Sequence, residues 1–168
     1  TTLFVTHDQT EALSISDHIA VLQDGHLVQE GTPADLYSRP QTGFIARFVG
    51  SANLVAGRFM SRDGDECEVQ TSLGTLRGMP VTDIPEGAAV SIAIRPDAVH
   101  IRESGLPRPN LLDGRVTSSV FTGDHTEFSY QAGDETLELK LLGLQRLAAG
   151  ETLRLYVDAE RCPVILRS

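Results

Sequence analysis

The heptapeptide Asn53-Leu54-Val55-Ala56-Gly57-Arg58-Phe59 returns in altered form as Asn110-Leu111-Leu112-Asp113-Gly114-Arg115-Val116. Both copies place Asn, two apolar residues, Gly and Arg in the same register, which suggests an internal repeat. Outward from each copy, short strand-like runs are separated by turn sequences such as Asp63-Gly64-Asp65 and Gly123-Asp124. Many short strands of even spacing indicate one or two small barrels and not a single open sheet. The predicted strands lie near 54–62, 66–72, 74–78, 88–95, 98–102, 111–122, 125–132, 135–142, 151–157 and 162–167.

Residues 1–50 follow a different pattern, in which helix and strand signals alternate. We therefore predict a boundary after residue 50, followed by a β-rich part over 51–168. The stretch 104–109, rich in Pro and Gly, is expected to be a loop that divides this part into two sub-barrels, about 51–104 and 110–168. The predicted fold class is mainly β, with a small barrel region preceded by a short α/β segment.

At the start of the chain, the apolar run from Thr2 to Val5 predicts a buried strand, which would pair within a sheet covered on both faces. Asp8 and Glu11 have the spacing of a capping box, so a helix is expected from about Gln9. Because the first residue is Thr1 and not Met, we expect the chain to be part of a longer one.

Turn and cap residues predict three further elements in this first part. Asp24-Gly25 accommodates the positive φ angles of a type I′ turn, and Thr32-Pro33 supplies a capping hydroxyl and a proline for a first helical position. The elements expected are a hairpin of strands 19–22 and 27–30, a helix over 33–38, and a helix from Thr42 that the left-handed Gly50 closes.

Composition removes several classes of function. The 168 residues carry 14 Lys and Arg against 23 Asp and Glu, a net charge of −9, which argues against a nucleic-acid or anionic-membrane surface. The apolar content of 40% is that of an ordinary globular protein. The sequence shows neither an apolar run of the ~18 residues that a membrane span needs nor a secretory signal, so we expect a cytoplasmic protein without direct membrane insertion.

His7 is the sharpest candidate for chemistry, because it ends the predicted strand directly before the predicted helix. Ligands of open α/β sheets gather at the carboxyl ends of strands, where an imidazole could bond a terminal phosphate oxygen or an attacking water. The alternative is that His7 merely satisfies a loop carbonyl. Asp8 is interpreted as a helix cap and not as a general base.

Other histidines and one arginine have competing interpretations. His18 and His26 flank the hairpin without an apparent third ligand, which favours solvated strand histidines over a metal pair. His125 and Thr126 could face an anion, although a plain turn is favoured. Arg95, extended before a proline, is interpreted as part of a buried or interfacial ion pair, with ligand recognition as the alternative.

Cys67 and Cys162 lack the paired spacing of zinc sites and are expected to be reduced residues of the core or of strands, without a disulfide. We predict no metal ligands in this chain. An acidic turn and strand lack the spacing of a calcium loop and are interpreted as a solvated edge that resists unwanted strand pairing. The acidic residues concerned are Asp63, Asp65, Glu66 and Glu68.

A long series of positions runs through the first part of the chain: Val5-Thr6-His7-Asp8-Gln9-Thr10-Glu11-Ala12, Asp17-His18-Ile19-Ala20-Val21-Leu22, Gly25, Gly31-Thr32-Pro33, Leu36-Tyr37, Pro40 and Phe48-Val49-Gly50. This series closely resembles the C-terminal part of the nucleotide-binding subunits of ABC importers of the maltose, polyamine and ferric-iron types. More weakly, Asn53-Leu54, Ile94-Arg95-Pro96-Asp97 and Gly114-Arg115-Val116 look like landmarks of the transport-associated OB (TOBE) domain appended to these subunits.

The resemblance implies that 1–50 is a C-terminal remnant of the ATPase domain and that 51–168 is an OB-like regulatory domain. It implies that His7 is the switch-loop histidine, which contacts the γ-phosphate of ATP and helps to position water in the intact parent, where ATP and Mg²⁺ are bound. The sequence contains no phosphate loop, no signature segment and no Asp-Glu pair after an apolar strand. We therefore expect this chain alone to bind no cofactor and to hydrolyse no ATP, which leaves its status as an enzyme open.

The implied partners are the transmembrane permease subunits and a second copy of the chain, at the inner face of the cell membrane. Because the sheet around the first strand is missing, we expect 1–50 to pack on its own barrel or to be covered in a homodimer. The transported solute stays open. The alternative from another class is a free-standing module that binds small oxyanions, disfavoured because 51–168 holds a single lysine, Lys140. An enzyme with its own site in the barrel has no supporting pattern.

Overall fold

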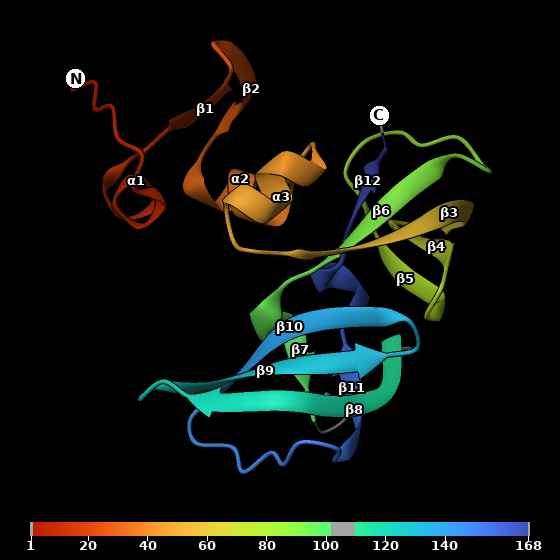
Figure 1. Ribbon diagram of the computed structural model, residues 1–168. Coiled ribbons are helices and arrows are strands. Elements are labelled where there is room, and N and C mark those ends of the chain that lie inside the picture. Colours follow the sequence, from red (N-terminus) through yellow and green to blue (C-terminus); the bar gives the residue numbers. More distant parts are fainter. Residues whose placement is uncertain (1, 102–109, 168) are drawn as a thin grey trace.

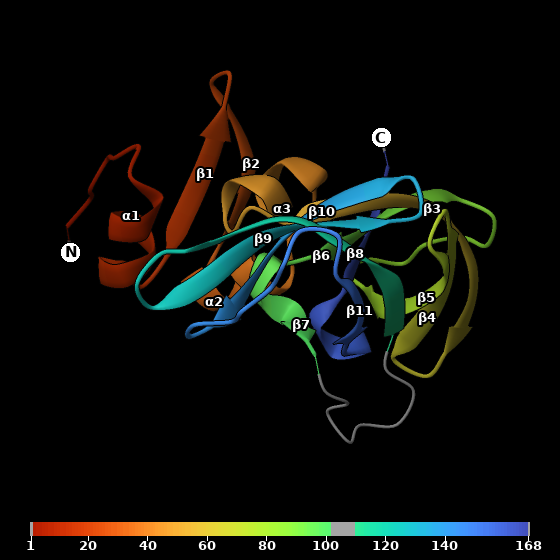
Figure 2. The same cartoon turned by 60° about the horizontal axis from the view of Figure 1, so that its bottom comes forward.

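A computed structural model of the protein describes residues 2–101 and 110–167. Two β-structures stand one above the other, and three short helices and a hairpin lie beside the upper one (Figure 1). The second view shows the hairpin projecting away from the β-structures, with the second and third helices at the base of the projection (Figure 2). No helix in the described part of the chain has both the length and the apolar character needed to cross a bilayer.

The predicted buried strand from Thr2 to Val5 is wrong. These residues adopt no regular structure, and Leu3 and Val5 are 92% and 88% exposed. A strand of this type needs neighbours on both sides and covering helices, and the described residues provide none for it. The helix that follows, α1 (Gln9–Ile15), begins as predicted, with the carboxylate of Asp8 accepting the N–H of Glu11.

The hairpin and the two later helices of the first part form where turn and cap chemistry predicts them. Strands β1 (Ile19–Gln23) and β2 (His26–Gly31) pair around Asp24 and Gly25, whose φ angles are +50° and +79°. Helix α2 (Pro33–Ser38) has a complete capping box between Thr32 and Asp35. Helix α3 (Gly43–Phe48) is capped by the hydroxyl of Thr42. Gly50 has a positive φ of +152°, and Ser51 takes the left-handed conformation at +51°.

A small apolar cluster holds this first part together. Val21, Leu36, Ile45 and Val49 are buried in it, which joins the hairpin to α2 and α3. The buried amide of Gln29 adds polar contacts, because it donates to the carbonyl of Arg39 and accepts the N–H of Gln41. The hairpin is therefore anchored at its base.

The first β-structure is a closed barrel of five strands. Its hairpins come from β3 (Asn53–Asp63), β4 (Glu66–Thr71) and β5 (Gly74–Pro80), and β6 (Ala89–Ile94) completes one side. The closing strand is β12 (Pro163–Leu166), which comes from the end of the described chain and pairs with both β5 and β6.

The second β-structure is a sheet in the order β10-β9-β8-β11-β7. It contains β8 (Asn110–Phe121), β9 (His125–Ala132), β10 (Glu135–Leu142) and β11 (Thr152–Val157). Its fifth member is the two-residue strand β7 (Val99–His100), which comes from the first half of the β-rich part.

The two β-structures thus exchange their last strands. In each half, three hairpin strands and a fourth strand lead to a 3₁₀ turn, η1 (Pro96–Ala98) or η2 (Ala159–Arg161), and then to a strand of the other half. The strand orders correspond one to one, which supports the repeat suggested by the two heptapeptides. One hydrophobic core runs through both structures, from Val55 and Ile92 to Leu112 and Phe128.

Reciprocal asparagine contacts fasten the two structures to each other. Asn53, at the start of β3, bonds the backbone N–H and C=O of Glu138 at 2.9 Å each. Asn110, at the start of β8, bonds the N–H and C=O of Arg77 at 2.7 and 2.8 Å. These are the first residues of the repeated heptapeptides, and each reaches into the partner structure.

The mainly β fold class with an OB-like barrel region is confirmed. The domain boundary after residue 50 and the division into about 51–104 and 110–168 stay predictions, although the exchanged strands mean that neither half completes its own sheet. The predicted loop 104–109 lies outside the described residues.

Candidate functional site

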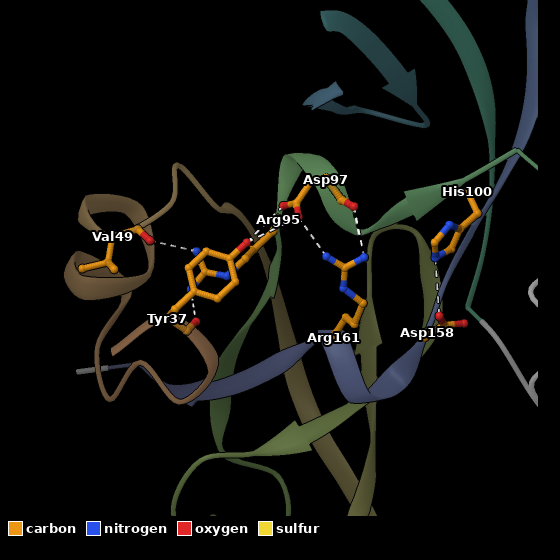
Figure 3. Close-up of polar contacts among 7 residues, drawn as sticks. All are labelled: Tyr37, Val49, Arg95, Asp97, His100, Asp158 and Arg161. Carbon is orange, nitrogen blue, oxygen red and sulfur yellow. Dashed lines mark hydrogen bonds and ion pairs between the residues drawn. The ribbon is translucent and has the colours of Figure 1, made fainter. Parts of the chain in front are cut away.

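The most elaborate polar arrangement lies where the first part meets the barrel, around Arg95 (Figure 3). Arg95 follows β6, and the residue is only 4% exposed. Its guanidinium donates to the carbonyls of Val49, at 3.2 Å, and of Tyr37, and it lies 3.7 Å from the centre of the Tyr37 ring. Burial lowers the pKa of Arg95, since desolvation disfavours the charged form.

These contacts have a simple cause in helix chemistry. Tyr37 lies in the last turn of α2, and Val49 is the C-cap residue of α3, so both carbonyls belong to helix ends that lack intrahelical partners. A cation at a helix C-terminus satisfies such carbonyls, and one guanidinium here serves two helices at once. Arg95 is buried at an interface, as predicted, but the predicted ion pair with an acid is not found among the described residues. Its close partners are two backbone carbonyls and an aromatic ring.

Asp97 and Arg161 extend this arrangement to the second half of the β-rich part. The hydroxyl of Tyr37 donates to Asp97 at 3.2 Å, and Arg161 donates to the Asp97 carboxylate at 2.9 Å and to its carbonyl at 3.1 Å (Figure 3). Although burial opposes it, hydrogen bonds from the backbone, Arg161 and Tyr37 hold the pKa of Asp97 below its ordinary value. Burial, followed by the charge of Asp97, raises the pKa of Tyr37.

His7 lies apart from this arrangement. It is exposed in the turn before α1. Thr6 orders the turn, because its hydroxyl accepts the N–H of Asp8 and donates to the Glu11 carboxylate, both at 3.0 Å. The cap interpretation of Asp8 is confirmed. The catalytic role of His7 stays a prediction.

The hairpin histidines are solvated, as predicted, and the register separates them. His26 pairs with Gln23 beside the turn, whereas His18 precedes the opposite end of the hairpin. His18 lies 3.9 Å from the carboxylate of Glu30, and the ring of His26 lies 3.0 Å from the carbonyl of Asp24.

His125 and Thr126 are the first two residues of β9, directly after the turn at Gly123 and Asp124. The ring of His125 lies between the carboxylates of Glu127, at 2.9 Å, and Asp124, at 2.6 Å. Hydrogen bonds from these two groups raise the pKa of His125. Thr126 is buried and bonds the loop at Gly143. The predicted turn therefore ends before His125, and both residues belong to a strand. The two carboxylates leave the imidazole of His125 unsuited to an anion.

The prediction that the acidic residues border a free edge is wrong. Strand β4 lies between β3 and β5 in the closed barrel, so no edge is available there. The side chain of Arg77 instead gathers the carboxylates of Asp63, Glu66 and Glu68 at 3.2, 3.7 and 3.4 Å. The sequence hides this pairing, because Arg77 lies on another strand.

Cys67 and Cys162 are free thiols buried in the core, as predicted. Burial raises the pKa of Cys67 to about 11 and that of Cys162 to about 12. Within 2–101 and 110–167, no three His, Cys, Asp or Glu side chains are grouped to hold a metal ion.

Sequence reasoning did not single out Tyr37, Asp97 or Arg161 for a contact with one another. Tyr37 and Asp97 are 60 residues apart, and Asp97 and Arg161 are 64 residues apart, in separate halves of the β-rich part. The exchange of strands brings Asp97 and Arg161 together. The sequence gives one signal: Arg95 directly follows an apolar strand, and a buried cation needs polar partners.

Comparisons with known proteins agree with this architecture. Residues 92–165 match the model of the TOBE domain family. The chain is 34% identical to a spermidine/putrescine import ATP-binding protein of Protochlamydia amoebophila, in a match that covers 83% of the chain and 39% of the relative. It is 36% identical to an Fe(3+) ions import ATP-binding protein of Rhizobium meliloti, over 90% of the chain and 42% of the relative.

The chain therefore spans about two fifths of the length of these curated relatives. Among solved structures, the molybdate-bound form of the cytoplasmic molybdate-binding protein ModG superposes with a TM-score of 0.55 and 14% identity, covering 68% of this chain and 96% of that one. At this identity the likeness concerns the fold alone.

Proposed function

Because the chain contains a TOBE domain and resembles the C-terminal part of ABC importer ATP-binding subunits, we propose that it is the regulatory end of such a subunit. In this function the β-rich part acts by binding, through contacts with neighbouring subunits or a regulator, and influences when the ATPase closes. The observation that carries the proposal is that sequence similarity runs through 82–90% of the chain, across both the helical first part and the β-structures.

The proposal assigns His7 to phosphate chemistry in the longer protein. Phosphoryl transfer depends on positioning and charge stabilisation, so an exposed imidazole on an ordered turn suits contact with the γ-phosphate of ATP and the attacking water. In the described part of the chain, no three His, Cys, Asp or Glu side chains are grouped to hold a metal ion, and we assign Mg²⁺ and most nucleotide contacts to other parts of the longer protein.

The test is ATP hydrolysis by the full-length parent. His7→Ala is expected to abolish most turnover and to leave the thermal transition unchanged, because the side chain is exposed and outside the core. His26→Ala is the matched control, since this histidine is also exposed but lies at the hairpin turn, and it should hydrolyse ATP normally. Near-normal hydrolysis by the His7 variant would remove it from the chemistry.

The proposed partners are the permease subunits, which would keep the protein at the inner face of the membrane, and a second copy of the chain. Helix α3 already packs on the barrel, so a dimer would have to cover other surfaces, such as the exposed Leu3 and Val5. Light scattering of the chain tests the second copy, and a strict monomer at high concentration contradicts it.

A second candidate function, binding of a small oxyanion, is favoured by one observation, the fold shared with ModG. The charge of the β-rich part argues against it, because its single lysine, Lys140, lies opposite Glu127 in the sheet. A thermal-shift screen with molybdate, sulfate and phosphate separates the two proposals. A saturable rise of several degrees would favour the oxyanion module.

A further inference from the structure

Three alanines and one isoleucine form the apolar contact between the first part and the barrel. Ala46 of α3, Ala52, Ala93 of β6 and Ile165 of β12 form a separate buried cluster. Alanine side chains let the helix and the strands approach closely, so this contact is short and tightly packed. A packed apolar contact of this kind resists sliding but by itself contains no directional bond.

Arg95 supplies the directional bonds at the same contact. Its guanidinium lies against Gly50, where a Cβ atom would overlap its Nη1 and would lie 3.2 Å from the Tyr37 ring. Residue 50 is therefore glycine for a reason beyond its positive φ of +152°. A bend of the chain at this glycine would pull the carbonyls of Val49 and Tyr37 away from a buried cation.

The polar contacts continue from Tyr37 through Asp97 to Arg161. From Arg95 the chain leads to Asp97, which binds Arg161 in η2. Directly after η2, β12 enters the barrel and brings Ile165 against α3. Arg95 thus contacts the ends of both helices, and the exchanged strand packs on α3 through Ile165. Figure 3 shows the polar contacts.

We propose that Arg95 makes the contact of α2 and α3 with the β-structures rigid, so that all of them move as one body. We call this contact the joint. A partner that binds the β-structures would then displace α2 and α3 directly, without an intervening hinge. The regulatory meaning of the joint rests on the proposed function, whereas the rigidity is a property of this chain alone.

The test measures a distance across the joint in the 168-residue chain. Ala34→Cys on α2 and Asp65→Cys at the barrel turn are both exposed and accept spin labels, while the native thiols stay buried. We expect one narrow distance distribution in electron–electron double resonance. Arg95→Met, which keeps bulk but removes the donors, is expected to add a second population, and Arg95→Lys, which keeps the charge but not the fork, a smaller one.

Arg154→Met is the matched control. It removes a bidentate pair with Asp113, at 2.7 and 3.0 Å, on the exposed face of the second sheet, so the distribution should stay narrow. A narrow distribution in folded Arg95→Met overturns the proposal. If that variant does not fold, Arg95→Lys decides in the same way, and loss of the β-structures in both variants also overturns it. No nucleotide takes part, so failure here leaves the proposed function untouched.

Discussion

Replacing Asn110 tests how firmly the two β-structures are fastened. Its side chain is 5% exposed and forms two hydrogen bonds with the backbone of Arg77, at 2.7 and 2.8 Å. In Asn110→Ala, one N–H and one C=O of the partly buried Arg77 lose their partners. Each such group costs about 1–3 kcal/mol, so we expect a loss of about 3 kcal/mol in the free energy of unfolding.

Asn53 provides a graded comparison. It also forms hydrogen bonds with a strand of the other structure, but it is only partly buried, so water can replace its bonds to Glu138. Asn53→Ala should therefore cost about 1 kcal/mol. Asn110→Asp keeps the acceptor for the Arg77 N–H but places a carboxylate beside the Arg77 carbonyl, and it should cost as much as Asn110→Ala.

Urea unfolding followed by far-UV circular dichroism measures these changes. For a chain of this size, a loss of about 3 kcal/mol lowers the midpoint by about 1 M, because the m value is roughly 2–3 kcal/mol/M. The transition should stay single, since the exchanged strands still join the two structures. A loss below about 0.5 kcal/mol at unchanged m would refute the reasoning that Asn110 satisfies otherwise isolated backbone groups.

Three further outcomes are expected. A Cβ atom at Gly114 would lie 2.8 Å from the Tyr130 ring and would overlap a backbone carbonyl, so Gly114→Ala should lower the melting temperature by several degrees, and an unchanged value would contradict the geometry. Cys67 and Cys162 should not react with a thiol reagent at pH 8 until urea unfolds the chain, when both should react at once, whereas reaction of either thiol in the folded chain would show that it is accessible. Because the pKa of Asp97 is lowered in the folded chain, its stabilising contribution is present above about pH 4 and disappears as the pH falls through the folded-state pKa. Asp97→Asn should therefore flatten the acid side of the plot of stability against pH. An unaltered acid side would argue against the bonds of Asp97 to Arg161.

Local chemistry made much of this fold predictable. Thr32 and Pro33 fix the start of α2, and Asp24-Gly25 fixes the hairpin, because caps and turns depend on neighbours within a few residues. The hairpins of the β-rich part follow for the same reason. These elements need no knowledge of distant contacts.

The features that the sequence did not predict depend on contacts between residues far apart in the chain. Thr2 to Val5 has the composition of a strand, but composition does not supply the neighbouring strands that a buried strand needs. The short β7 and β12 were recognisable as strands, but their exchange depends on pairings between separate halves. For the same reason, the partners of Arg95 were not visible from its own sequence neighbourhood. The proposed role of His7 rests on resemblance, because the sequence of this chain lacks the phosphate loop and the magnesium ligands that such a role requires.

The late arrival of β12 has a consequence during synthesis. Strands β3 to β6 are synthesised well before residues 163–166. During this interval the barrel lacks β12, the strand that closes the gap between β5 and β6. Both borders of that gap present backbone groups to any passing strand, which is a hazard for a newborn chain. A chain whose synthesis stops before residues 163–166 would therefore expose two unpaired strands and be prone to aggregation. Chaperones that bind exposed β-strands would protect it most in this interval.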